Sequence, residues 1–165
     1  MEVLSDSIHK LGNSFKSTNG NALNKYVEQI LIEYTSLGYI KKFIKEPKYK
    51  MPGYEQTQFN PDFEITLLDG SIIVIDNTTT IRSDRMKQKQ WDSFGVKAYF
   101  ESIGETILSY VVIPNEEDLG SANTNSTEIK MYLNYRENLL SGRIYSAIDD
   151  VLPISELLEQ IKFAI

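Results

Sequence analysis

The sequence predicts a mixed α/β fold of the α+β kind, in which helices flank a mixed central sheet. The chain has 165 residues, which is the usual size of one domain. Segments with the 3.6-residue apolar period of a helix alternate with short apolar runs of strand length. One pair of these runs is joined by Asp69-Gly70, a hairpin signal. We therefore expect a single domain over residues 1–165, with residues 1–20 as a polar tail or loop.

The pattern in the N-terminal part predicts one helix and then a loop. Apolar residues recur at helical spacing over residues 22–37, and Gly38 follows as a stop signal. Residues 39–58 carry several lysines, two prolines and a glycine. We expect a loop there, with at most a short strand over residues 39–44.

The C-terminal part predicts a long helix and a buried strand before further helices. Ser83 can cap a helix over residues 84–102, although Gly95 weakens the helical pattern. A strand over residues 107–113 ends at Pro114. The aromatic residues expected to pack in the core are Trp91, Phe94, Tyr99 and Phe100. The remaining expected elements are a loop over 115–127, a helix over 128–140, a short strand over 143–148 and a helix over 155–163.

Composition excludes several classes of site. The chain has no cysteine and one histidine, His9, so thiol catalysis, Cys-based zinc sites and His-rich metal sites are implausible. Any metal ion must therefore be held by oxygen. The net charge of −6 argues against broad, non-specific nucleic-acid binding. Without a run of about 20 apolar residues or a secretory leader pattern, we expect a cytoplasmic protein that does not associate with a membrane.

The register of the predicted hairpin decides whether two of its acids lie together. A two-residue loop at Asp69-Gly70 would turn Asp76 to the face opposite Asp62. A three-residue loop over residues 68–70, with Gly70 in the left-handed conformation, would place Asp62 directly opposite Asp76. Glu64 and Thr78 would then share that face.

Two carboxylates on directly opposed residues can hold one Mg²⁺ ion. Such residues lie roughly 4.5–5.5 Å apart, and unpaired carboxylates this close repel each other. A divalent cation would remove the repulsion. The alternative is that Asp62 and Asp76 stand at strand ends and face solvent.

These residues resemble the PD-(D/E)XK nuclease superfamily, and type II restriction endonucleases in particular. The Pro-Asp of the family falls on Pro61 and Asp62, and its (Asp/Glu)-x-Lys falls on Asp76, Asn77 and Thr78. The resemblance implies a restriction-endonuclease-like core over roughly residues 20–113, built from a helix, a strand pair, a helix and a further strand. An acid on the first helix, which the family often has, would be Glu28.

The resemblance implies an Mg²⁺-dependent, sequence-specific endonuclease that hydrolyses phosphodiester bonds in double-stranded DNA. Asp62, Asp76 and the backbone carbonyl of Asn77 would bind the metal, with Glu28 or Glu64 contributing through a water or a second ion. Mn²⁺ is an alternative ion, and Ca²⁺ would bind without supporting cleavage. A homodimer is expected because a symmetric pair of sites cuts both strands most simply. A cognate methyltransferase is a partner that the resemblance allows.

Thr78 departs from the family pattern, because it stands where the lysine should be. A neutral hydroxyl cannot supply the positive charge that orients water or offsets phosphate charge. Lys87 or Lys89, on the following helix, could reach back toward the metal. The alternative is that both lysines are solvated or contact phosphate.

Basic residues near the predicted site could bind the DNA backbone. Arg82 and Arg85 lie at a helix N-terminus, which favours anions, although a surface ion pair with Asp84 is an equal alternative. The other candidates for DNA contact are Lys87, Lys48 and Lys50. Two rival functions stay open: a nuclease fold that binds DNA or regulates without catalysis, and a protein-binding α/β module without a nucleic-acid role.

Overall fold

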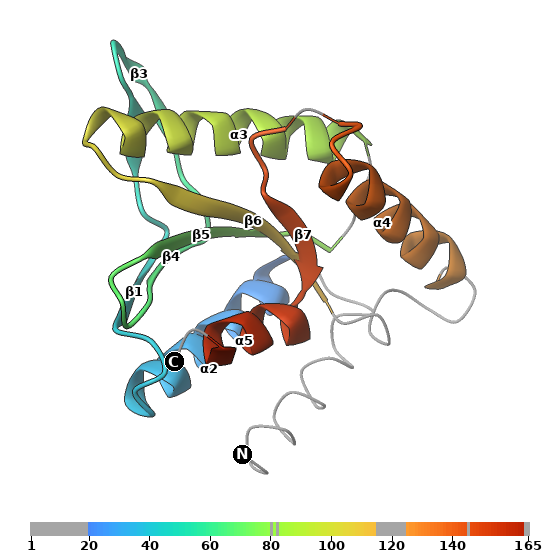
Figure 1. Ribbon diagram of the computed structural model, residues 1–165, viewed down its shortest axis with the longest axis horizontal. Coiled ribbons are helices and arrows are strands. Elements are labelled where there is room, and N and C mark those ends of the chain that lie inside the picture. The colour runs from blue at the N-terminus through green and yellow to red at the C-terminus, as the bar shows by residue number, and fades with distance from the viewer. Residues whose placement is uncertain (1–19, 80, 82, 115–124, 145, 164–165) are drawn as a thin grey trace.

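The fold is a central sheet with helices packed on both faces (Figure 1). The computed structural model describes residues 20–79, 81, 83–114, 125–144 and 146–163. Helices α2 (Gly20–Ser36) and α5 (Ile154–Phe163) cover one face of the sheet, and α3 (Ser83–Ser102) and α4 (Asn125–Leu140) cover the other. The predicted mixed α/β class is confirmed.

The sheet has five strands in the order β1-β4-β5-β6-β7. The first three strands in that order pair antiparallel, and the last three pair parallel. The parallel pair β5–β6 is connected through α3, as parallel neighbours require a crossover. The strands are β1 (Lys42–Lys45), β4 (Phe63–Thr66), β5 (Ile72–Asn77), β6 (Ile107–Ile113) and β7 (Asp150–Pro153).

Alternation along β5 divides its side chains between two apolar clusters. Ile73 and Ile75 are buried against α2 and α5, whereas Val74 is buried under α3. Asp76 therefore lies on the α3 face of an otherwise apolar strand. As predicted, β5 is covered on both faces, so a charge on it is poorly solvated.

The short strand allowed over residues 39–44 overlaps β1, but the rest of residues 39–58 is not the predicted loop. A separate antiparallel hairpin forms there, made of β2 (Tyr49–Met51) and β3 (Tyr54–Phe59). Polar residues alternate with few apolar ones in this hairpin, and most of its side chains are exposed. A strand is usually recognised in a sequence by alternating apolar and polar residues, because one of its faces is buried. A hairpin that is exposed along most of its length shows little of this alternation.

The last strand is also displaced from its predicted position. It was expected over residues 143–148 and lies at Asp150–Pro153. Two acids, Asp149 and Asp150, interrupt the apolar pattern just before the buried Val151 and Leu152. Arg136 of α4 pairs with the buried Asp150 at 3.0 Å, a tertiary contact that local sequence patterns do not reveal.

Gly95 has a packing role in α3, which runs continuously through it. A Cβ atom at this position would lie 2.1 Å from the ring of Phe59 in β3. Because the ring is buried, Gly95→Ala is expected to destabilise the fold by about 1–2 kcal/mol. This figure is the cost of overpacking, reduced by the higher helix propensity of alanine. Urea unfolding measures this change.

A double-mutant cycle identifies the clash as the cause. In a Phe59→Leu background the cost of Gly95→Ala should shrink or change sign, since the aromatic ring is gone. An equal cost in both backgrounds would contradict this explanation.

Candidate active site

The β4–β5 hairpin brings Asp62 and Asp76 together. Thr66 pairs with Ile72 and Phe63 with Ile75, and just beyond the last pair the side chains of Asp62 and Asp76 come within hydrogen-bonding reach of each other. The N–H of Leu67 donates to the carbonyl of Ser71 at 2.8 Å, and Gly70 has a φ of 89°. The three-residue loop is therefore confirmed, and the two-residue alternative is excluded.

Asp62 is fixed by amides from two different elements. The backbone N–H of Asn77 donates to Asp62 Oδ2 at 2.6 Å, and Nδ2 of Asn24 in α2 donates to Asp62 Oδ1 at 3.1 Å. Asn77 Nδ2 donates in turn to Asn24 Oδ1 at 2.9 Å. This ring of contacts holds one carboxylate in a defined orientation beside the other.

Asp76 is paired with a lysine from the following helix. Lys89 Nζ lies 3.1 Å from Asp76 Oδ2, and both side chains are largely buried. Asp76 is also within hydrogen-bonding reach of Asp62. Desolvation on this buried strand, together with the charge of Asp62, outweighs the opposing effect of Lys89 and raises the pKa of Asp76 to about 8.

The donor set fits a hard divalent cation. The raised pKa of Asp76 means that this carboxyl holds a proton beside Asp62, and a divalent cation can replace that proton. Mg²⁺ is usually bound through one or two carboxylates and keeps several waters. Asn77 adds oxygen donors beside the pair, and its buried Oδ1 has no hydrogen-bond partner in the described part of the chain.

A third acid does not join the pair. Within the described ranges, no group of three or more Asp, Glu, His or Cys residues is placed to hold a metal ion. Glu28 forms an ion pair with Lys45 at 3.0 Å, and Glu64 accepts a hydrogen bond from the hydroxyl of Tyr49. Of the four acids predicted as metal ligands, Asp62 and Asp76 are in contact with each other. Glu28 and Glu64 instead bind other side chains.

Thr78 directly follows β5, and the two lysines that could replace the missing one lie on α3. Thr78 is buried, and its N–H donates to the carbonyl of Val112 at 2.9 Å. Lys89 reaches the acid pair, whereas Lys87 is exposed on the same helix. Of the two lysines proposed to reach back, only Lys89 does so.

The basic residues proposed for DNA contact occupy two places. Arg85 and Lys87 are exposed near the start of α3, and Lys48 and Lys50 are exposed on the β2–β3 hairpin. None of these four makes an ion pair with another described residue. Arg82 lies outside the described residues.

Two residues of the site were not foreseen from the sequence. Asn24 is one helical turn before Glu28, and a polar residue between the buried Leu23 and Val27 is the signal that could have found it. Asp92 lies one turn after Lys89 on α3. Burial raises the pKa of Asp92, although Lys89 opposes the shift.

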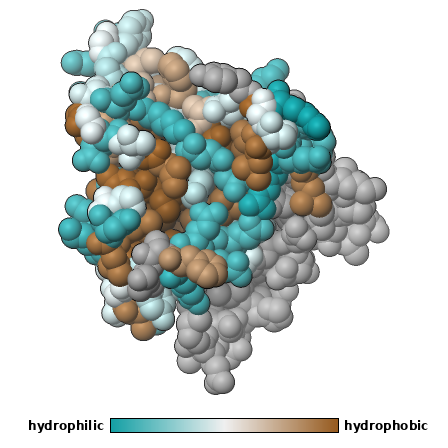
Figure 2. All heavy atoms as spheres, in the orientation of Figure 1, coloured by the Kyte–Doolittle hydropathy of each residue, from teal (hydrophilic) through white to brown (hydrophobic). Residues whose placement is uncertain are grey.

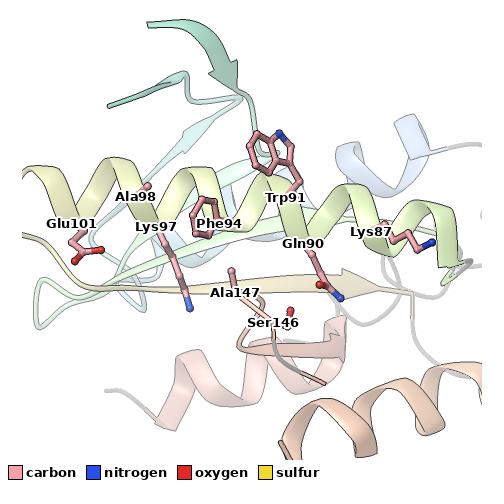
Figure 3. A pocket seen from close by; sticks show the side chains of 9 residues that line it. All are labelled: Lys87, Gln90, Trp91, Phe94, Lys97, Ala98, Glu101, Ser146 and Ala147. Atoms are coloured by element: carbon pink, nitrogen blue, oxygen red, sulfur yellow. The ribbon is translucent and has the colours of Figure 1, made fainter. Parts of the chain in front are cut away.

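A cavity apart from the acid pair has a volume of about 590 Å³. It lies between α3 and residues 146–147 (Figure 3). Trp91 and Phe94, predicted to be core residues, stand on its edge with 51% and 53% of their surfaces exposed. They stack on each other on the side of α3 turned away from the sheet, so the prediction was wrong for this pair, whereas Phe100 is buried as expected.

Comparisons with known proteins identify no relative. No protein-family model matches the chain, and no curated protein or solved structure matches it. Among the described residues, no helix is long and apolar enough to cross a membrane.

The raised pKa of Asp76 predicts a pH dependence of stability. The folded chain keeps a proton on Asp76 that the unfolded chain, with a pKa near 3.8, releases. The free energy of unfolding should therefore fall as pH rises from about 4 to about 8, by at most about 1.4 kcal/mol per pH unit. Urea unfolding in EDTA at several pH values measures the slope. Asp76→Asn should flatten it, and an unchanged slope would contradict the assignment.

Proposed function

We propose that this protein is an Mg²⁺-dependent endonuclease that hydrolyses phosphodiester bonds in double-stranded DNA. The observation that carries the proposal is the contact of Asp62 and Asp76 at the end of β5, with Lys89 3.1 Å from Asp76. Two carboxylates and a lysine can bind a metal ion and offset charge on a phosphate.

The element order supports the resemblance to PD-(D/E)XK nucleases. Helix α2, the strand pair β4–β5, helix α3 and strand β6 come in the order that the resemblance implies, with β1 and the β2–β3 hairpin between α2 and β4. Pro61-Asp62 precedes β4, and Asp76-Asn77 ends β5. Lys89 offers the positive charge that Thr78 lacks, from the helix that follows the motif.

Each residue of the site has a distinct part in the proposed reaction. Asp62 and Asp76 would hold Mg²⁺, which when bound lowers the pKa of water and acts as a Lewis acid toward phosphate. Asn24 and the N–H of Asn77 orient Asp62. Lys89, 3.1 Å from Asp76, would orient the attacking water or stabilise the charge that develops on the phosphate.

We further propose that the protein is a restriction endonuclease, which cleaves DNA at a specific sequence as a homodimer. Two strands of a duplex require two cuts, and a twofold pair of sites matches the symmetry of the substrate. Sedimentation with and without DNA should report a dimer. A monomer that still cuts both strands in one binding event would contradict the dimer.

The decisive experiment is digestion of unmethylated phage DNA by the full chain. With Mg²⁺ we expect discrete fragments, and with EDTA intact DNA. Ca²⁺ in place of Mg²⁺ should permit binding without cleavage. Intact DNA in Mg²⁺ and in Mn²⁺ would contradict the nuclease.

A second candidate function is a DNA-binding or regulatory subunit that retains the fold without the chemistry. Thr78 in the lysine position and the net charge of −6 favour it. Binding of DNA that Ca²⁺ tightens, with no cleavage in Mg²⁺ or Mn²⁺, would support this candidate. A protein that binds neither Ca²⁺ nor DNA would exclude both functions.

A further inference from the structure

The β2–β3 hairpin projects from the body of the molecule beside α3 (Figure 1). In β3 (Tyr54–Phe59), four of six residues are exposed, a fifth is half-buried, and Phe59 alone is buried. A space-filling view in the same orientation shows this end of the molecule as largely hydrophilic (Figure 2). A two-stranded hairpin is marginally stable by itself, so its base must be anchored.

Three aromatic contacts anchor the base. Tyr49 packs against Tyr99 and Phe100 of α3, with ring centroids 4.9 and 5.0 Å away, and its hydroxyl donates to Glu64 of β4. Phe59 fits against Gly95 and lies 6.0 Å from the ring of Trp91. The hairpin is thus fixed to β4, which directly follows Asp62, and to α3, which carries Lys89.

The outer face of the hairpin carries basic and amide side chains. Tyr49 pairs with Phe59 and Lys50 with Gln58, so alternation turns Lys50 and Gln58 away from α3. Gln56 lies in the part of β3 where the register shifts. All three are exposed, as is Lys48, two residues before Lys50. Two of these four side chains are basic and none is acidic, while the neighbouring Glu55 of β3 is also exposed.

This face leads directly to the acid pair. Gln58 Nε2 donates to Asn60 Oδ1 at 3.1 Å, and Asp62 follows two residues later. In extended chain, Gln56 lies at most about 20 Å from Asp62 and Gln58 at most about 14 Å. Both distances are shorter than one turn of duplex DNA, about 34 Å. Side chains of the hairpin can therefore contact bases while Asp62 and Asp76 lie at a phosphate of the same turn.

We propose that the β2–β3 hairpin lies in the major groove of duplex DNA and determines sequence preference. The inference rests on the proposed nuclease function. The major groove admits a two-stranded β-ribbon, and glutamine amides bind the N6 and N7 edge of adenine in a bidentate way. Gln56 and Gln58 read bases, whereas Lys48 and Lys50 bind the flanking phosphates.

The test measures binding of the full chain to a pool of duplexes with randomised centres, in Ca²⁺. Bound duplexes are sequenced, and affinities are measured over a range of salt. Lys48→Ala and Lys50→Ala should each weaken binding to every duplex and reduce the slope of log K against log salt by about 1. Gln56→Ala and Gln58→Ala should relax the preference at particular base pairs by roughly 5- to 150-fold.

Matched controls use exposed residues on the opposite face of the sheet. Lys162→Ala on α5 and Gln29→Ala on α2 should leave the affinity, the salt slope and the selected sequences unchanged. As a test of the groove, 7-deazaadenine at a selected position should weaken binding by the wild-type chain and not by the corresponding glutamine variant, since it lacks the N7 acceptor.

The outcomes separate this inference from the function on which it rests. If the wild-type chain binds and cuts DNA but all four hairpin variants bind as the wild type does, the hairpin proposal is overturned and the nuclease stands. If the wild-type chain binds no duplex even at low salt, both are overturned. If the variants lose self-association and keep their DNA contacts, the face binds a second copy of the chain, which also overturns the proposal.

Discussion

Asp76→Asn is expected to reduce Mg²⁺-dependent cleavage by at least about 10³-fold while the fold is retained. Asparagine has the shape of the aspartate and can still accept a hydrogen bond from Lys89, but it lacks the charge that attracts a cation. The carboxylate pair becomes a single carboxylate. Cleavage rates under single-turnover conditions measure the loss, and circular dichroism checks the fold.

A metal-binding measurement separates this effect from a general disturbance of the site. A cation that binds the folded chain raises its melting temperature, so Ca²⁺ should stabilise the wild-type chain and not Asp76→Asn. Asp69→Asn is the matched control, since Asp69 is in the exposed turn at the other end of the same hairpin. It should cleave as the wild type does. Normal cleavage by Asp76→Asn would remove the basis of the proposed function.

The acid pair was predictable from the sequence because turn chemistry fixes strand register. Gly70 can adopt the left-handed conformation of a three-residue loop, and one residue of slip would have separated Asp62 from Asp76. Strand β5 and helix α2 were likewise predictable, because β5 contains a continuous apolar run and α2 has a clear apolar period.

The parts that sequence reasoning missed depend on tertiary contacts. Asn24 matters because α2 packs beside Asp62, which no local pattern indicates. Trp91 and Phe94 have the hydrophobicity of core residues, but the side of α3 that carries them faces away from the sheet. The hairpin of β2 and β3 is stabilised by Tyr49 and Phe59 against α3, so its strands carry little alternation of their own.

Lys89→Ala is expected to lower the rate of the chemical step by about 10²–10³-fold, with a small change in KM. The reason is geometric: Lys89 Nζ is 3.1 Å from the carboxylate that would hold the metal, so the same ammonium is close to water and phosphate bound there. A charge aimed at the reacting group affects the transition state more than the bound substrate. Single-turnover rates over a range of DNA concentrations separate the two effects.

Lys87→Ala is the matched variant, because Lys87 is on the same helix turn but exposed. It should alter KM and its salt dependence and leave the single-turnover rate within a few-fold of the wild type. The contrast between the two lysines distinguishes a catalytic charge from a phosphate contact. If Lys89→Ala cleaves at the wild-type rate, its ion pair with Asp76 serves only to neutralise the buried acid before a cation binds. The positive charge that Thr78 lacks would then not come from Lys89, and the catalytic role assigned to Lys89 would be overturned.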